Sequence, residues 1–171
     1  MADIYYDGEL GSNSTGNGSQ SNPYQFPLNA HGAAGDVFYL RRGKTHMLNY
    51  IYGWTPRMAS SPSGLRTKVK AWGEAQIPHA IIDNSHATGP TINISGAPTG
   101  RANLDFEDMW VLGTGHTSYP IYVHCYTAEL EDINLRRCKV TGKASSAKDG
   151  LNIASDAPEL YINRRITIED C

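Results

Sequence analysis

The chain has 171 residues, of which 40% are hydrophobic and 19% are charged, and its formal net charge is −2. This balance excludes a disordered tail, which carries more charge and fewer large apolar groups, and it speaks against a nucleic-acid partner bound through a basic surface. Seventeen glycines and nine prolines argue against a helix bundle, whereas ten tyrosines beside many Thr, Val and Ile favour strands.

The first forty residues combine two short strands with a polar loop. Residues 4–6 (IYY) and 37–40 (VFYL) predict strands, because β-branched and aromatic side chains suit extended backbone. Residues 8–22 are almost wholly Gly, Ser, Asn and Thr and predict a loop, and residues 26–34 (FPLNAHGAA) predict one or two helical turns.

The next segment is mostly irregular. Residues 43–66 contain Gly53, Pro56, Pro62 and Gly64, so they predict a long loop. Residues 68–72 (KVKAW) then alternate between polar and apolar side chains, as a half-buried strand does.

From residue 80 onward the sequence repeats. One apolar pattern is shared by residues 104–109 (LDFEDM), 133–138 (INLRRC) and 166–171 (ITIEDC). A second series of short apolar segments, at residues 92–94, 121–123 and 151–153, recurs at nearly the same interval. Two interleaved series of short strands that share a period of about 30 residues predict a solenoid, in which each coil pairs with the next.

The fold class that we expect is all-β: a right-handed parallel β-helix with an N-terminal cap, about four to five coils and an open C-terminal end. Three columns of inward apolar side chains are predicted: Leu104–Ile133–Ile166, Phe106–Leu135–Ile168 and Met109–Cys138–Cys171. Two outward columns alternate in charge: Glu107–Arg136–Glu169 and Asp108–Arg137–Asp170.

We expect a single domain over residues 1–171. It comprises a cap and first strand (1–43), a long loop and early coil (44–79) and repeated coils (80–171). Because the last repeat strand stops at Cys171, we expect a fragment of a longer chain, and a second chain that covers this end is the alternative.

The chain resembles the right-handed parallel β-helix superfamily of pectate-lyase type. The resemblance rests on residues 18–24 (GSQSNPY), residues 35–43 (GDVFYLRRG) and the repeats over 92–171. It implies a solenoid with an N-terminal cap. The superfamily includes polysaccharide lyases, glycoside hydrolases, phage tailspikes and structural solenoids without activity, so the fold suggests a polysaccharide partner and leaves the reaction open.

Candidate catalytic residues lie on the outward faces of the repeats. A lyase needs a base and a cation that neutralises the substrate carboxylate, for which Arg136, Arg137, Lys139 and Lys143 are candidates. A hydrolase needs two carboxylates, for which the candidates are Asp105 with Glu107, or Glu131 with Asp132. Charge ladders and turn caps are the competing structural explanation for the same residues.

A sugar-binding column is predicted on the second strand series. Asn93, Tyr122 and Asn152 stack in one outward column, with His124 beside Tyr122, and these groups offer ring area and hydrogen-bonding partners for hydroxyls. A purely structural asparagine ladder is the alternative.

Two loops carry further candidates. Lys143, Lys148 and Asp149 form a candidate groove wall in the loop 141–150. Tyr50, Tyr52 and Trp54 mark a carbohydrate or protein contact if exposed, and a solenoid cap if buried.

The N-terminus shows no signal-peptide pattern, and no apolar run long enough to span a membrane is present, so no membrane partner is expected. Cys125, Cys138 and Cys171 show no zinc or disulfide spacing and are expected to be small buried residues. No metal or other cofactor is expected.

Two functions therefore remain open. The first is an extracellular or virion-associated β-helix that recognises a polysaccharide and, if it is an enzyme, cleaves it as a lyase or glycosidase. The second is a non-catalytic solenoid, of tailspike, stalk, adhesin or capsid-decoration type, that acts as a trimeric or end-stacked homo-oligomer.

Overall fold

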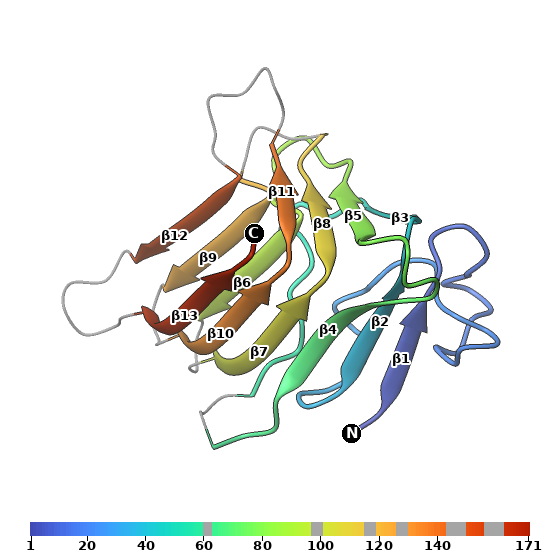
Figure 1. Cartoon of the computed structure of the whole chain (residues 1–171), viewed down its shortest axis with the longest axis horizontal. Coiled ribbons are helices and arrows are strands. Elements are labelled where there is room, and N and C mark those ends of the chain that lie inside the picture. Colours follow the sequence, from blue (N-terminus) through green and yellow to red (C-terminus); the bar gives the residue numbers. More distant parts are fainter. Residues whose placement is uncertain (60–62, 97–100, 115–118, 126–129, 143–149, 156–162) are drawn as a thin grey trace.

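The protein folds as a parallel β-solenoid of about four coils (Figure 1). The computed structural model describes residues 1–59, 63–96, 101–114, 119–125, 130–142, 150–155 and 163–171. Within these residues the chain forms thirteen strands and no helix, and every strand pairs in parallel with the equivalent strand of a neighbouring coil. The all-β fold class and its solenoid architecture are thus confirmed.

The strands build three sheets that run along the stack. In spatial order, the six-stranded sheet contains β1 (Asp3–Tyr6), β2 (Val37–Arg41), β4 (Thr67–Trp72), β7 (Arg101–Glu107), β10 (Leu130–Arg136) and β13 (Asn163–Glu169). The four-stranded sheet contains β3 (Thr45–Leu48), β5 (Ala80–Asn84), β8 (Met109–Leu112) and β11 (Lys139–Thr141). The three-stranded sheet contains β6 (Ile92–Gly96), β9 (Ile121–Cys125) and β12 (Leu151–Ser155).

The core is a set of apolar columns inside the coils. Phe106 lies between Val69 and Leu135 in the register of β4, β7 and β10, and all three side chains are buried. The same register extends to Ile168, and it aligns Leu104 with Ile133 and Ile166, so both predicted columns are confirmed.

The cysteine column is only partly as expected. Cys138 is buried, and burial raises the pKa of its thiol to about 12. Its backbone N–H donates to Cys171 Sγ over 3.3 Å, so these two residues are neighbours. Cys171 was expected to be buried, but it is exposed because it follows β13, the last strand of the six-stranded sheet. The side chain of Cys125 lies outside the described residues.

A left-handed backbone residue directly follows three successive strands of the six-stranded sheet. Asp108, Arg137 and Asp170 have φ of 58°, 49° and 53° and follow β7, β10 and β13 directly. This conformation is uncommon for residues other than glycine. Its recurrence after β7, β10 and β13 places the second charge ladder at a corner of the solenoid.

Two local predictions are wrong. Residues 26–34 form turns and bends instead of a helix, because Gly32 and Gly35 adopt positive φ and interrupt any helical run. The expected loop over residues 43–66 contains β3, in which His46 is buried and Met47 is exposed. Histidine is usually exposed and methionine usually buried, so the inverted order leaves no hydrophobic alternation by which the sequence could reveal this strand.

The N-terminal end of the stack is closed. The outer edge of β1 is paired, since Tyr5 N–H donates to the Gly18 carbonyl over 2.8 Å and the Tyr5 carbonyl accepts from Tyr24 N–H over 3.0 Å. Trp54 closes the three-stranded sheet by pairing with β6, and it is 1% exposed. Its indole packs between Phe38 and Phe106, so Trp54 is a buried cap and offers no ring to a ligand.

Candidate functional site

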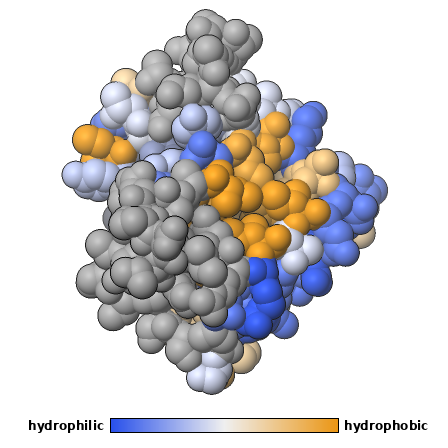
Figure 2. Space-filling view, turned by 90° about the vertical axis from the view of Figure 1, so that its left-hand side faces the viewer, coloured by the Kyte–Doolittle hydropathy of each residue, from blue (hydrophilic) through white to orange (hydrophobic). Residues whose placement is uncertain are grey.

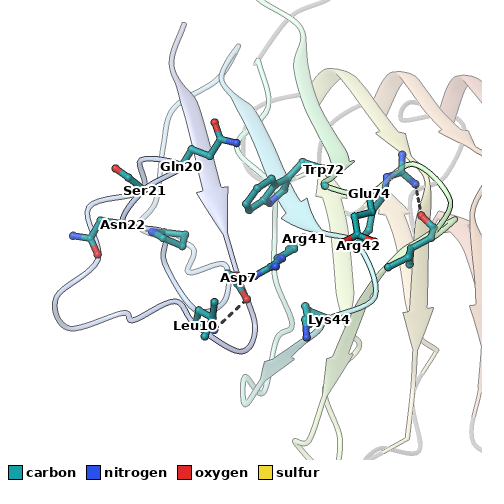
Figure 3. A pocket seen from close by; sticks show the side chains of 13 residues that line it. Asp7, Leu10, Gln20, Ser21, Asn22, Arg41, Arg42, Lys44, Trp72 and Glu74 are labelled. Atoms are coloured by element: carbon teal, nitrogen blue, oxygen red, sulfur yellow. Dashed lines mark hydrogen bonds and ion pairs between the residues drawn. The ribbon is translucent and has the colours of Figure 1, made fainter.

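A pocket of about 500 Å³ opens at the N-terminal end of the solenoid (Figure 3). We call it the end pocket. One wall is a loop over residues 7–24, the cap loop, and the other wall is formed where β2 and β4 end. The lining residues are Asp7, Leu10, Gln20, Ser21, Asn22, Pro23, Arg41, Arg42, Lys44, Trp72, Gly73, Glu74 and Ile77.

The register of β2 and β4 builds the strand-end wall. Arg41 is the direct partner of Trp72, and Arg42 N–H donates to the Trp72 carbonyl over 2.8 Å. Just beyond these positions Gly43 and Gly73 adopt φ of 69° and 103°, which turns both chains away from the sheet at the same level. The two strand ends therefore leave a recess that the cap loop encloses.

Trp72 is the largest aromatic surface in the end pocket and is held in one orientation. Its indole N–H donates to the Tyr6 carbonyl over 3.1 Å, and the Arg41 guanidinium lies 5.9 Å from the ring centroid. Tyr5 contacts the ring edge-on at 5.4 Å and stacks on Tyr39 at 4.9 Å. Figure 3 shows the indole pointing toward the loop that carries Gln20. A fixed, half-buried ring of this kind loses little entropy when it binds a flat partner.

The cations at the end pocket are balanced by nearby anions. Arg41 pairs with Asp7, Lys44 pairs with Glu9, and Arg42 donates to Asp108 over 2.9 Å. With its partners the pocket therefore carries about as many negative as positive groups, which favours an uncharged ligand over an anionic one.

Asp7 is held as an ionised acceptor. It accepts hydrogen bonds from Arg41 and from the backbone N–H groups of Glu9 and Leu10, over 3.0 and 3.1 Å for the last two. Burial by itself raises the pKa of Asp7, but these donors outweigh it and hold the pKa below its usual value. A carboxylate held in this way orients its neighbours and is a poor proton donor.

The cap loop supplies the neutral polar groups. Gln20, Ser21 and Asn22 lie at the rim, and the Asn22 amide donates to the Thr15 carbonyl over 3.1 Å, which fixes the loop. Amide and hydroxyl groups beside an aromatic ring are the combination that suits a hydroxylated ring, which presents apolar faces and a polar edge.

The candidate catalytic residues lie together on the outside of the six-stranded sheet, and each has an oppositely charged neighbour. Asp105 accepts from Arg66 over 2.7 Å, and Glu107 pairs with Lys70 over 3.2 Å. Arg136 pairs with Glu169 over 3.1 Å. These contacts build a charge ladder along the stack.

The remaining charged candidates are also paired. Arg137 pairs with Asp108 over 2.7 Å, Glu131 with Arg165 over 2.8 Å, and Asp132 with Arg66. Lys139 lies over the ring of Trp110, 4.1 Å from its centroid. Lys143, Lys148 and Asp149 lie outside the described residues.

The predicted sugar column is brought together on the three-stranded sheet. Tyr122 lies between Asn93 and Asn152 in the register, and its ring stacks on His124 at 5.0 Å and on Tyr119 at 6.2 Å. His124 is only 1% exposed, so it is not an open contact surface.

Tyr50, Tyr52 and Trp54 were expected to form a ligand contact if exposed and a solenoid cap if buried, and they differ in exposure. Tyr52 is 72% exposed, and its carbonyl accepts from the Asn93 amide over 3.0 Å. Tyr50 is partly buried against the core, like the buried Trp54.

Sequence reasoning missed the end pocket. Phe38 pairs with Val69 in the register, so the repeat that is visible from residue 80 onward extends back to β2 and β4. The same spacing aligns Arg41 with Trp72 and is the signal that would have found the strand-end wall. The enclosing cap loop carries no repeat.

In the part of the chain that the structure describes, no helix is long and apolar enough to cross a membrane. Among the same residues no group of three His, Cys, Asp or Glu side chains is arranged to hold a metal ion.

Comparison with known proteins gives one informative likeness. No protein-family model matches the chain, and no curated protein matches it. The structure is similar to the crystal structure of the native GH136 lacto-N-biosidase from Eubacterium ramulus, with a TM-score of 0.59 and 12% sequence identity. The match covers 99% of this chain and 40% of that chain, so this chain spans less than half the length of that protein. At such low identity the likeness shows the fold, a parallel β-helix, and the resemblance to the pectate-lyase type in particular stays a prediction.

Proposed function

We propose that this protein is a glycan-binding β-solenoid that takes an uncharged sugar ring in the end pocket. The observation that carries the proposal is Trp72, a half-buried indole fixed by three neighbours, which faces a rim of amide and hydroxyl groups. Sugars stack their C–H faces on such rings, and their hydroxyls exchange hydrogen bonds with groups like those of Gln20 and Asn22.

The balance of charge selects among glycans. Because Arg41, Arg42 and Lys44 are each paired with a carboxylate, a uronate or sulfate would have to displace an existing partner. An uncharged oligosaccharide needs no such exchange. The protein in Eubacterium ramulus with a similar fold is a lacto-N-biosidase, which is compatible with a carbohydrate ligand for this chain.

We propose that the protein binds a glycan without cleaving it. Glycoside hydrolysis needs two carboxylates flanking the bond, one of them able to give up a proton. The carboxylates predicted for this role, Asp105 with Glu107 and Glu131 with Asp132, are all engaged in ion pairs. Display outside the cell or on a virion surface belongs to the same proposal, because polysaccharides are presented there.

The test is a glycan array followed by titration calorimetry of each hit with four proteins: the unaltered chain, Trp72→Ala, Trp110→Ala and Tyr122→Ala. We expect uncharged glycans among the hits and about tenfold weaker binding for Trp72→Ala, since ring stacking contributes about 1–1.5 kcal/mol. Trp110 is a matched control, because it is another partly exposed tryptophan on a different sheet.

Three results would contradict the proposal. Binding lost in Tyr122→Ala but kept in Trp72→Ala would move the site to the column on the three-stranded sheet. Hits restricted to anionic glycans would refute the charge argument. New reducing ends or unsaturated products from a bound glycan would show cleavage. Circular dichroism of each variant separates a lost contact from a lost fold.

A further inference from the structure

A buried histidine lies directly beneath the cap loop. The loop touches β3 at Gly8, where a Cβ atom would lie 2.1 Å from the Thr45 carbonyl oxygen, so this close approach needs glycine. The side chain of the next residue along β3, His46, is fully buried. The protein thus encloses a titratable ring between the cap loop and the strands below it.

The two ring nitrogens of His46 contact opposite walls of the end pocket. Nδ1 lies 3.2 Å from the carbonyl oxygen of Gln25, the residue that follows the cap loop, and Nε2 lies 3.3 Å from the carbonyl oxygen of Arg41 on the strand-end wall. Gln25 is tied into the cap loop, because its N–H donates to Asn13 Oδ1 over 2.7 Å. His46 therefore connects the cap loop to the strand-end wall.

The charged groups around this ring are already matched with one another. The cap loop contributes Asp7 and Glu9, which pair with Arg41 and Lys44 from the opposite wall. A proton on His46 would add a third cation to a region in which both carboxylates have a basic partner.

The remaining surroundings also disfavour a charged ring. On β5, the residue opposite His46 in the register is Ile82, which is buried and apolar. The two carbonyls and the charge of Asp7 favour the protonated ring, but the loss of water outweighs them and holds the pKa of His46 below its usual value.

The cap loop has little apolar burial that would keep it closed. Residues 8–22 contain a single large apolar side chain, Leu10, and it is 73% exposed. The hydrophobic side chains that gather in Figure 2 lie on the other side of the molecule from this loop. A loop that is held mainly by polar contacts opens at a small cost in free energy.

We propose that His46 is a pH-dependent latch of the end pocket. The neutral ring fits the dry site between the two carbonyls and holds the cap loop closed. The protonated ring is better solvated when the loop lifts, so acid opens the pocket and moves the rim groups of Gln20 and Asn22 away from Trp72. A glycan in the end pocket opposes this opening, a consequence that rests on the function proposed above.

The pH range of the latch follows from proton linkage. Because the pKa of His46 is lowered in the closed state, the open state takes up the proton more readily, and closure weakens as the pH falls below about 6.5. The pKa of Asp7 is also lowered, so Asp7 stays ionised through this range. His31, which stacks on Tyr24 at 3.8 Å, is a second histidine whose pKa is lowered by burial, and it provides the matched control.

The test is hydrogen–deuterium exchange of the full chain without ligand at pH 7.5 and pH 5.5, with rates corrected for the intrinsic effect of pH. The reporters are the N–H groups of Gly11 and Ser12, which donate to carbonyls within the cap loop. We expect about tenfold lower protection at pH 5.5, because protonation of an open-state group with a pKa of about 6.5 shifts the equilibrium by this factor. The difference should vanish in His46→Gln, whose amide does not titrate, and persist in His31→Gln.

A second measurement needs no variant. The ring signals of His46 in the unaltered chain should titrate with an apparent pKa below about 6.5. Protection that does not change with pH, that rises at pH 5.5, or that falls equally in His46→Gln would overturn the latch.

Addition of a glycan from the array separates this inference from the proposed function. A glycan bound in the end pocket should restore the protection of Gly11 and Ser12 at pH 5.5, since it binds the closed state. If acid opens the loop through His46 but no glycan restores protection, the latch stands and the proposed function fails. If a glycan protects the loop but pH has no effect, the pocket stands and the latch fails.

Discussion

Asp7 links the stability of the end pocket to pH. Its pKa is lowered in the folded protein by Arg41 and two backbone N–H groups, despite the opposing effect of burial. A carboxyl group whose folded pKa is depressed stabilises the fold above its unfolded pKa, about 3.9, and loses that contribution as the pH falls through the folded value.

We therefore expect that Asp7 leaves the melting temperature nearly constant from pH 8 to pH 5. When the pH drops below about 4, the melting temperature should decrease. In Asp7→Asn the melting temperature at neutral pH is lower and the acid-induced fall is shallower. Glu74→Gln, at an exposed position of the same pocket, is the control and should leave the profile unchanged. Parallel acid profiles for Asp7→Asn and the unaltered protein would contradict this assignment.

A variant of Arg66 can distinguish a structural role of Asp105 from a catalytic one. Its guanidinium pairs with Asp105 and Asp132, and the Asn134 amide also donates to Asp105 over 2.8 Å. Arg66→Met leaves Asp105, which is 8% exposed, without its cation, and should lower the free energy of unfolding by about 1–3 kcal/mol.

Urea denaturation measures this loss, and Arg57→Met, a cation on a neighbouring segment, serves as the matched control. A loss equal to that of the control would mean that the ion pair contributes nothing. A variant Asp105→Asn that is fully stable but abolishes turnover of a bound glycan would return Asp105 to a catalytic role.

At the scale of elements, the closure of the N-terminal end depends on Trp54. The side chain is buried against Phe38 and Phe106, while Tyr52, two residues earlier, is exposed. Trp54→Ala should cost about 3–5 kcal/mol in unfolding free energy, the usual range for a buried aromatic residue. Tyr52→Ala should change it by less than about 0.5 kcal/mol.

Thermal or urea unfolding of the two variants provides the comparison. If Tyr52→Ala is as destabilising as Trp54→Ala, the loop closes the stack through another contact. If Tyr52→Ala instead weakens glycan binding, the sugar surface lies on this loop and not in the end pocket.

The sequence predicted the strands of the six-stranded and three-stranded sheets well, but it did not single out the strands of the four-stranded sheet, β3, β5, β8 and β11. The columns through Leu104 and Phe106 repeat apolar side chains at intervals of about 30 residues, so they follow from the period alone. In β3 the buried positions are His46 and Leu48, and the ring nitrogens of His46 lie 3.2 Å from the Gln25 carbonyl and 3.3 Å from the Arg41 carbonyl. A histidine satisfied by distant carbonyls leaves no hydrophobic pattern to detect.

Among the candidate sites, too, one could be predicted from the sequence and one could not. The Asn93–Tyr122–Asn152 column lies on repeated strands and was predictable. The end pocket joins strand ends to a loop, and Asp7 meets Arg41 through a contact between distant parts of the sequence that no period encodes. Composition showed that residues 8–22 cannot form a core, but not that this loop folds back over β2 and β4.

For the molecule as a whole, the end pocket lies at the closed N-terminal end of the solenoid, away from the repeated coils. The three tryptophans sample different regions: Trp54 lies in the core, Trp72 in the end pocket, and Trp110 on the four-stranded sheet, where its indole N–H donates to Thr141 over 3.1 Å.

One titration therefore tests the central claim. Each indole N–H gives its own signal in a nitrogen–proton correlation spectrum of the labelled protein, and an uncharged oligosaccharide from the array is added stepwise. We expect the Trp72 signal to move with saturation while the Trp54 and Trp110 signals stay in place. Saturable binding that leaves Trp72 unmoved and shifts Trp110, or none of the three, would contradict a glycan site in the end pocket.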